Sequence, residues 1–191
     1  MLLSPQAERN WEGICEVLED VLDDQSHKQL FALEIGSGTG QHVIRFAQKL
    51  PFITWQPSDI KEECRDSIKA YIAATHVKTV LQPVLLDASE PWDKWAGVSR
   101  NTCDVIVAVN LLQYSSFKTA QVYAVNGVIT PSCNEVLDEE LRKLNPEWGL
   151  PDLDVLRQQA YGNGLRLERM VRNNVLKTLN VNTVQTPRYI W

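Results

Sequence analysis

Residues 33–40 read LEIGSGTG, and this stretch decides the fold through what lies on either side of it. A short apolar run, 30–35, leads into the glycines, and an amphipathic segment follows them as far as Pro51. Glycines at alternate positions let the backbone turn sharply and approach a ligand closely, and a helix that begins there presents free amide groups. The stretch predicts a strand, a glycine loop and a helix, in which the loop is either a ligand site or simply a tight turn.

The spacing of the glycines indicates which ligand suits the loop. A dinucleotide site uses G-x-G-x-x-G, whereas Gly40 comes one residue early, and the loop lacks the Lys or Arg of a P-loop. Glu34 precedes the first glycine, where its carboxylate can accept a hydrogen bond from an ammonium group while nearby amides receive a carboxylate. The amino-acid moiety of S-adenosylmethionine carries both groups. The loop therefore favours such a ligand and disfavours a nicotinamide-dependent oxidoreductase.

Strand-like and helix-like segments alternate around the loop. Before it, apolar residues with helical spacing run from Trp11 to Leu22. The segments expected after it are a strand at 52–55 that stops early or bulges at Pro57, a helix over 60–71, a strand-like run at 79–86 interrupted at Pro83, and a buried strand at 104–109. This alternation predicts an α/β fold with a mostly parallel central sheet and helices on both faces.

The pattern weakens further along the chain. The segments expected there are a stub of helix at 115–121, a turn at 126–127, a helix over 137–144, a second helix over 153–160, a strand at 165–171 and a strand around 179–181.

Polar side chains stand where three of the predicted strands end, which is where ligands bind in open α/β sheets. Asp59 can accept both hydroxyls of a ribose, although Asp59 and Glu62 also have the spacing of a capping box for the next helix. Asp87 can accept an adenine amino group, or it can simply close its strand. Asn110 can face the sulfonium end of the ligand or the substrate, or it can bond to the backbone.

Composition and charge exclude other classes of protein. The 191 residues carry a net charge of −5 and a pI near 5.2, which disfavours nucleic-acid binding through a broad basic face. Acidic residues are in excess over 1–34 and basic residues over 165–191, and we interpret both as solvated surfaces. The four cysteines and three histidines have no zinc spacing, so no metal site is expected. With neither a secretory leader nor a membrane-spanning run, we expect an intracellular protein, cytoplasmic or nuclear.

Taken together, these features resemble a class I S-adenosylmethionine-dependent methyltransferase. More narrowly, the chain is similar to the methyltransferase-like protein 26 family. The stretches that carry the similarity are 4-SPQAERNWEGI-14, 33-LEIGSGTGQH-42, 54-TWQPSD-59, 123-YAVNGVITPSCNE-135 and 145-NPEWGLPDLD-154.

The resemblance implies a Rossmann-like methyltransferase sandwich and a bound S-adenosylmethionine, but neither a known methyl acceptor nor a catalytic residue. The cofactor-binding residues that it implies are Glu34, Gly36, Ser37, Gly38, Gly40, Gln41, Asp59 and Asp87. Arg9 and Asn10 match a pair at the mouth of the active site, and Asn110 joins them as a substrate-side candidate.

The chain departs from the family's pattern in three places. Gln113 stands where the family has a histidine, and glutamine cannot act as a general base at neutral pH. Between Gln121 and Tyr123 a segment on the order of 20–25 residues is missing, the length of one helix and one strand with their turns. Beyond Met170 the tail diverges. We therefore expect the sheet to lack one central strand, unless 165–171 pairs with 104–109, and we interpret the chain as a variant of the family.

A single methyltransferase-like domain over 1–191 follows, with a helical cap at 1–29, a cofactor-binding half at 30–110 and an incomplete substrate-side half at 111–191. The favoured function is methyl transfer from S-adenosylmethionine to a small molecule or a protein. The alternative is an inactive relative that binds the cofactor without turnover, or a non-functional variant.

Overall fold

The computed structural model describes residues 1–95, 98–99, 102–111, 124–125, 128–129, 133–146, 158, 167–172, 177–181 and 188–190. Six strands form one sheet in the order β2-β1-β3-β8-β7-β6. Their bounds are β1 Leu30–Ile35, β2 Ile53–Ser58, β3 Val105–Ala108, β6 Leu167–Arg172, β7 Lys177–Val181 and β8 Arg188–Ile190. The first three strands and β8 run parallel, whereas β7 is antiparallel to both of its neighbours.

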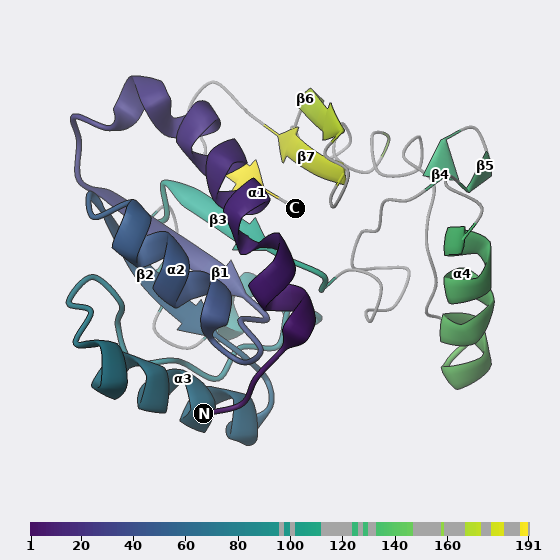
Figure 1. Ribbon diagram of the computed structural model, residues 1–191, viewed down its shortest axis with the longest axis horizontal. Helices are drawn as coiled ribbons and strands as arrows, with labels where there is room; N and C mark the ends of the chain where they lie inside the picture. Colours follow the sequence, from purple (N-terminus) through teal and green to yellow (C-terminus); the bar gives the residue numbers. More distant parts are fainter. Residues whose placement is uncertain are drawn as a thin grey trace.

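Helices follow the strands of the parallel half, as the alternation predicts. The helices and remaining short elements are α1 Pro5–Leu22, η1 Asp23–Gln25, α2 Gln41–Lys49, α3 Glu62–Thr75, η2 Trp92–Lys94, α4 Cys133–Leu144 and the antiparallel pair β4 Ala124–Val125 and β5 Val128–Ile129. In Figure 1, α1 and α2 lie side by side across the parallel strands, and α4 lies at the far end of the view with β4 and β5.

The core explains why the strands are apolar on both faces. Val105 and Val107 pack with Leu18 and Phe46 of the two covering helices. The alternate residues of the same strands face the opposite side, where Ile106 belongs to a second buried cluster. A strand buried on both faces reads as a continuous apolar run, which is the pattern of β3. The α/β fold with a mostly parallel sheet is confirmed.

The central position of the sheet differs from the expectation. β8 pairs in parallel with β3, with Val105 opposite Arg188 and Val107 opposite Ile190. The position that we expected to be vacant is therefore occupied by a strand from the divergent tail. The alternative pairing of 165–171 with 104–109 is wrong, because β6 lies at the far edge of the sheet. The central position is occupied because an unpartnered edge on β3 would leave buried amides and carbonyls without hydrogen-bond partners.

The expectation that the second strand stops early or bulges at Pro57 is wrong. β2 runs through it to Ser58, with Pro57 opposite Glu34 of β1. The 79–86 segment lies along the outer side of β2, where it forms two isolated parallel bridges, Val80 with Trp55 and Val84 with Ser58. The side-chain amide of Gln56 donates to the carbonyl of Gln82 at 2.8 Å. A proline is tolerated here because the outer ladder is already broken and its missing N–H is not required.

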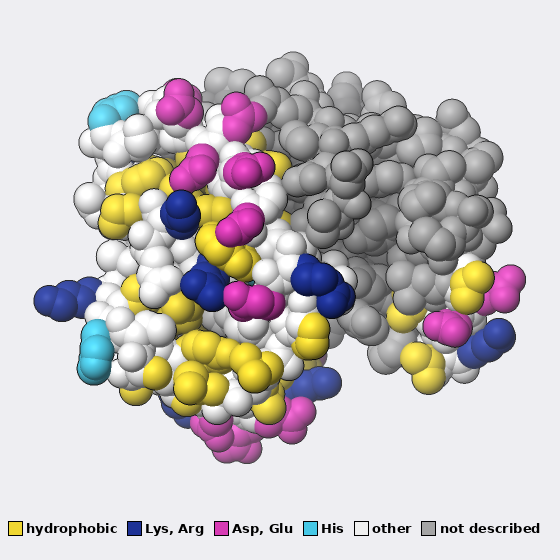
Figure 2. Space-filling view, viewed as in Figure 1, with side chains coloured by type: hydrophobic (Ala, Val, Ile, Leu, Met, Phe, Trp, Pro, Cys, Tyr) yellow, Lys and Arg dark blue, Asp and Glu magenta, His cyan; other side chains and the backbone are white. Residues whose placement is uncertain are grey.

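The acidic excess of the N-terminal region is a solvated surface, as predicted. Figure 2 shows acidic side chains along the outer side of α1. The acids of α1 and η1 are exposed, namely Glu8, Glu12, Glu16, Glu19, Asp20, Asp23 and Asp24. Glu34 is the exception in this region, since its side chain is buried.

One further expectation is confirmed, and several others fall on residues that the structure does not describe. α4 ends at Leu144, directly before Asn145 and Pro146, as predicted. The segments 115–121 and 126–127 lie outside the described residues, as does Gln113, and of the expected helix 153–160 only Gln158 is described, in helical conformation. Within the described residues, no helix is long and apolar enough to cross a membrane.

Candidate functional site at the carboxyl edge of the sheet

The glycine loop, residues 36–40, connects β1 to α2 with three left-handed residues. The φ angles of Gly36, Gly38 and Gly40 are 68°, 54° and 90°. A Cβ on Gly36 would lie 2.8 Å from Leu111 Cδ1, and one on Gly40 would lie 2.9 Å from Ile68 Cγ1, whereas one on Gly38 would meet nothing within 4 Å. The outer two glycines therefore allow close packing, and the middle one leaves open space above the backbone.

Two serines fix the base of this loop. The Ser37 amide donates to the Ser58 carbonyl at 2.8 Å, and the Ser58 amide donates to Ser37 Oγ at 3.1 Å. Ser58 Oγ donates to the Glu34 carbonyl at 2.8 Å. Ser58 is fully buried and was not among the predicted site residues. Its position beside Asp59 at the end of a predicted strand was the available signal.

Asp59 is brought directly to the loop. Its Oδ2 accepts a hydrogen bond from the Gly38 amide at 2.9 Å, and its Oδ1 accepts one from the Lys61 amide at 2.9 Å. The capping box with Glu62 is wrong, because the N-cap of α3 is Lys61 and no side chain caps it. The short link to Lys61 is an Asx turn, which holds the carboxylate against the loop and leaves part of its acceptor capacity for another donor.

Glu34 is the most unusual group of the site. Its side chain is 1% exposed, and its Oε2 has no hydrogen-bond partner among the residues that the structure describes. The pKa of Glu34 is raised to about 7, chiefly by burial; a hydrogen bond with Ser37 lowers it, and the negative charge of Asp59 raises it. Buried polar atoms without partners are rare in folded proteins. The carboxyl group is therefore poised to accept a hydrogen bond that the described part of the chain does not supply.

Asp87 and Asn110 each follow a segment that reaches this edge of the sheet. The Asp59 amide donates to the Val84 carbonyl at 3.2 Å, so the segment before Asp87 lies beside Asp59. Asp87 itself accepts from the amide and hydroxyl of Ser89, which hold the pKa of Asp87 below its ordinary value. Asn110 follows β3 with a φ of 53°, a left-handed conformation that asparagine tolerates better than most residues.

The two N-terminal candidates, Arg9 and Asn10, differ in burial. Arg9 is exposed on α1. Asn10 is buried, and its Oδ1 lies 2.8 Å from Nε2 of His42, a residue that the sequence did not single out. Burial lowers the pKa of His42 to about 4. Gln41, predicted to bind the cofactor, is buried and bonded to the segment before α1 and to Thr39. The roles of these residues toward a ligand remain predictions.

Because His42 is buried, we expect the unfolding free energy of the protein to fall in acid. Because the folded-state pKa of His42 lies near 4 and its ordinary value is 6.5, the unfolded chain binds a proton first as the pH falls. The His42 contribution to stability is present above pH 6.5 and is lost between 6.5 and 4. We expect His42→Asn to flatten the dependence of the unfolding free energy on pH in this window.

Chemical denaturation at several pH values measures this effect. His27→Asn, at an exposed position, is the matched control and should leave the acid limb as it is in the unsubstituted chain. An equally steep limb in His42→Asn would contradict the assignment.

Metal-ligating groups do not gather in the described ranges. No group of three or more His, Cys, Asp or Glu side chains there could hold a metal ion. Cys15 and Cys103 are buried free thiols, and Cys64 is a half-buried one. The arrangement as described offers hydrogen-bond acceptors and an open backbone face, which suits an organic ligand that carries an ammonium group and hydroxyls.

The chain belongs to the family described as "Protein of unknown function (DUF938)". That family matches residues 1–123 and again residues 119–179. The two matches overlap at residues 119–123, the place where we expect a segment of the family to be missing. This match does not by itself identify the narrower methyltransferase-like protein 26 family that the sequence resembles.

Solved structures define the class of fold. The chain is similar to magnesium protoporphyrin IX methyltransferase from Synechocystis, which has bound SAH, with a TM-score of 0.59 and 15% identity over 91% of this chain and 81% of that one. An O-methyltransferase family protein from Burkholderia thailandensis gives a TM-score of 0.67 and 13% identity over 93% of this chain and 58% of that one. The YcgJ protein from Bacillus subtilis gives 0.62 and 14% over 87% and 71%. The fold is therefore that of the Rossmann-like methyltransferases.

Proposed function

We propose that the chain binds S-adenosylmethionine at the carboxyl edge of β1 and β2 and transfers its methyl group, as a member of the methyltransferase-like protein 26 group. The carrying observation is the buried Glu34 carboxyl with an unpartnered Oε2. An ammonium donor in reach of that oxygen relieves the unsatisfied group and favours its ionised form. The open face of Gly38 supports the same ligand, because none of the described residues fills the space that a Cβ would take.

The residues present fit the group at both of its polar ends. Glu34 would hold the ammonium, and the amides of the glycine loop would receive the carboxylate. Asp59 would accept the ribose hydroxyls with the capacity that Gly38 and Lys61 leave free. Asp87 would lie on the adenine side. Arg9, Asn10 and Asn110 would face the methyl acceptor, directly or through their neighbours.

When bound, S-adenosylmethionine supplies an activated methyl group on a positively charged sulfur. The protein's part in such a displacement is alignment of donor and acceptor, for which a dedicated nucleophile is not required. Orientation by Glu34 and Asp59 at two ends of one ligand supplies that alignment. The acceptor that we propose is a small molecule or a protein rather than nucleic acid or membrane. The proposed setting is intracellular, with all of 1–191 acting as one domain.

Calorimetry with the full chain tests the proposal. We expect S-adenosylmethionine and its demethylated product S-adenosylhomocysteine to bind, and NAD not to bind. Absence of binding by both adenosyl ligands would overturn the proposal. Transfer of a labelled methyl group to a cell extract then separates an enzyme from a relative that binds without turnover.

Loss of Asp59 gives the first quantitative test of the site. We expect Asp59→Ala to weaken S-adenosylhomocysteine binding by about 1–3 kcal/mol, the range for removal of a charged hydrogen-bond partner. The Gly38 amide also loses its acceptor in this variant, so Asp59→Asn, which keeps an acceptor oxygen, should lose less. Asp66→Ala on the exposed side of α3 is the control and should bind as tightly as the unsubstituted chain. Equal affinities in all three would remove Asp59 from the site.

A further inference from the structure

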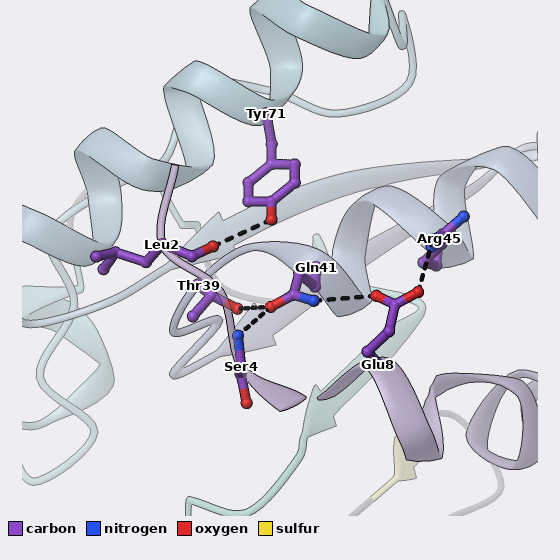
Figure 3. Close-up of polar contacts among 7 residues, drawn as sticks. All are labelled: Leu2, Ser4, Glu8, Thr39, Gln41, Arg45 and Tyr71. Atoms are coloured by element: carbon purple, nitrogen blue, oxygen red, sulfur yellow. Dashed lines mark hydrogen bonds and ion pairs between the residues drawn. The ribbon is translucent and has the colours of Figure 1, made fainter. Parts of the chain in front are cut away.

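The N-terminal strap, residues 2–8, is fastened across α2 and α3. The Leu2 amide donates to Ser67 Oγ at 2.7 Å, and the Tyr71 hydroxyl donates to the Leu2 carbonyl at 3.0 Å. The Ser4 amide donates to Gln41 Oε1. Figure 3 shows Tyr71 reaching the strap from α3 while Gln41 reaches it from the start of α2. Backbone groups of the strap make these bonds, so they do not depend on which side chains the strap carries.

Gln41 joins the strap to the glycine loop. Its Oε1 accepts a second hydrogen bond from Thr39 Oγ1 at 3.0 Å, and its Nε2 donates to Glu8 Oε2 at 3.0 Å. Glu8 in turn pairs with Arg45 of α2 at 2.8 Å. A glutamine amide offers both an acceptor oxygen and donor hydrogens, and Gln41 spends both on the strap and the loop. Its side chain is 5% exposed, so water is poorly placed to replace these bonds.

Thr39 is also held through its carbonyl by Ser67, a residue that bonds to the strap as well. Ser67 Oγ donates to the Thr39 carbonyl at 2.8 Å and accepts from the Leu2 amide. Thr39 lies between Gly38, which faces open space, and Gly40, which is packed on Ile68. The hydroxyl and the carbonyl of Thr39 therefore depend on residues that also fasten the strap.

We infer that Gln41 is a positioning residue, and that docking of the strap through it sets the geometry and ligand affinity of the glycine loop. This inference rests on the proposed function for its ligand but not for the coupling of strap and loop. When the strap leaves, Gln41 and Ser67 each lose a partner, and Thr39 loses the arrangement that fixes it. By linkage, if docking raises the affinity for a ligand, the ligand must stabilise docking by the same factor.

Binding of S-adenosylhomocysteine to full-length variants tests the coupling. We expect Gln41→Ala to weaken binding about tenfold and Tyr71→Phe, which loses a strap bond without touching the loop, to weaken it two- to threefold. Gln48→Ala is the matched control, since Gln48 is an exposed glutamine on the same helix. It should bind as the unsubstituted chain does. Unchanged affinity in Gln41→Ala would overturn the inference.

Amide exchange by NMR gives a readout without ligand. In the free protein we expect Gln41→Ala to speed exchange at Gly38 and Gly40, whose amides bond to Asp59 and Ser37. If the unsubstituted chain binds no adenosyl ligand but this exchange still accelerates, the proposed function fails and the coupling stands. If the ligand binds but exchange at both glycines is unchanged, the coupling is refuted and the proposed function stands.

Discussion

Glu34→Gln is expected to make the free protein more stable above pH 7 while removing most of its affinity for S-adenosylmethionine. Burial raises the pKa of Glu34 from 4.5 to about 7 in the folded chain. Its contribution to stability is therefore present below pH 4.5 and is lost as the pH rises to 7, because the unfolded chain ionises first. A neutral glutamine does not titrate. At pH 8 the variant should gain about 1–3 kcal/mol of unfolding free energy, and at pH 4 it should gain nothing from this source.

The loss of affinity has the same origin. A glutamine in place of the buried carboxylate leaves the ligand's ammonium without its counter-charge, which costs about 2–4 kcal/mol or roughly 30- to 1000-fold in binding. In the unsubstituted chain, binding should weaken about fivefold between pH 7 and pH 6, because the carboxyl group must give up its proton to the solvent. The variant should lose this pH dependence.

Denaturation and calorimetry at pH 4, 6 and 8 measure both effects in the same samples. Glu12→Gln, an exposed position on α1, is the control for removal of one negative charge. A variant that is less stable at pH 8 and binds normally would show that the buried carboxyl serves the fold and not a ligand.

The glycines of the loop should separate stability from binding. Gly40→Ala places a Cβ 2.9 Å from Ile68 Cγ1 and 3.1 Å from Ile68 Cα, at a φ of 90°. The backbone atom cannot move aside as a side-chain end can, so we expect a loss of about 3 kcal/mol, or roughly 6–12 °C in Tm. Gly38→Ala meets no atom within 4 Å and should cost only about 1 kcal/mol for its left-handed backbone.

Ligand affinity should suffer most at Gly38, the position where a substitution costs less stability. Gly38→Ala should weaken S-adenosylhomocysteine binding about tenfold, and Gly38→Val should abolish measurable binding, because the branched side chain fills the space beside the loop. Thermal unfolding and calorimetry on the variants suffice. A Gly38→Val protein that binds normally would show that the open face of the loop is not where the ligand lies.

The parallel half of the fold could be predicted from the sequence because local patterns encode it. The apolar run of β1, the glycines that need positive φ, and the acid at the end of β2 each have a signature within a few residues. The expectation for Pro57 was wrong because the interrupted hydrogen bonding on the outer side of β2 is a property of the assembled sheet, not of the local sequence. Ser58, His42 and Gln41 act through partners about 20 to 40 residues away in the chain, such as Glu34, Asn10 and Ser4. No periodicity marks such side-chain contacts.

The strand β8 could not be predicted for a related reason. Its three residues, Arg188–Ile190, are too few for an alternating pattern, and parallel pairing gives no turn signal that joins the two strands. The sequence suggested a missing segment after Gln121, but it did not reveal the strand that takes the central position.

The same strand also constrains how the protein is made. β3 ends at Ala108 and its partner begins at Arg188, so roughly 80 residues must leave the ribosome before that side of β3 is covered. Through that interval an apolar strand presents free amides and carbonyls that another nascent chain can capture. Yield in cells should therefore depend on chaperone supply and growth temperature more than the stability of the finished protein suggests.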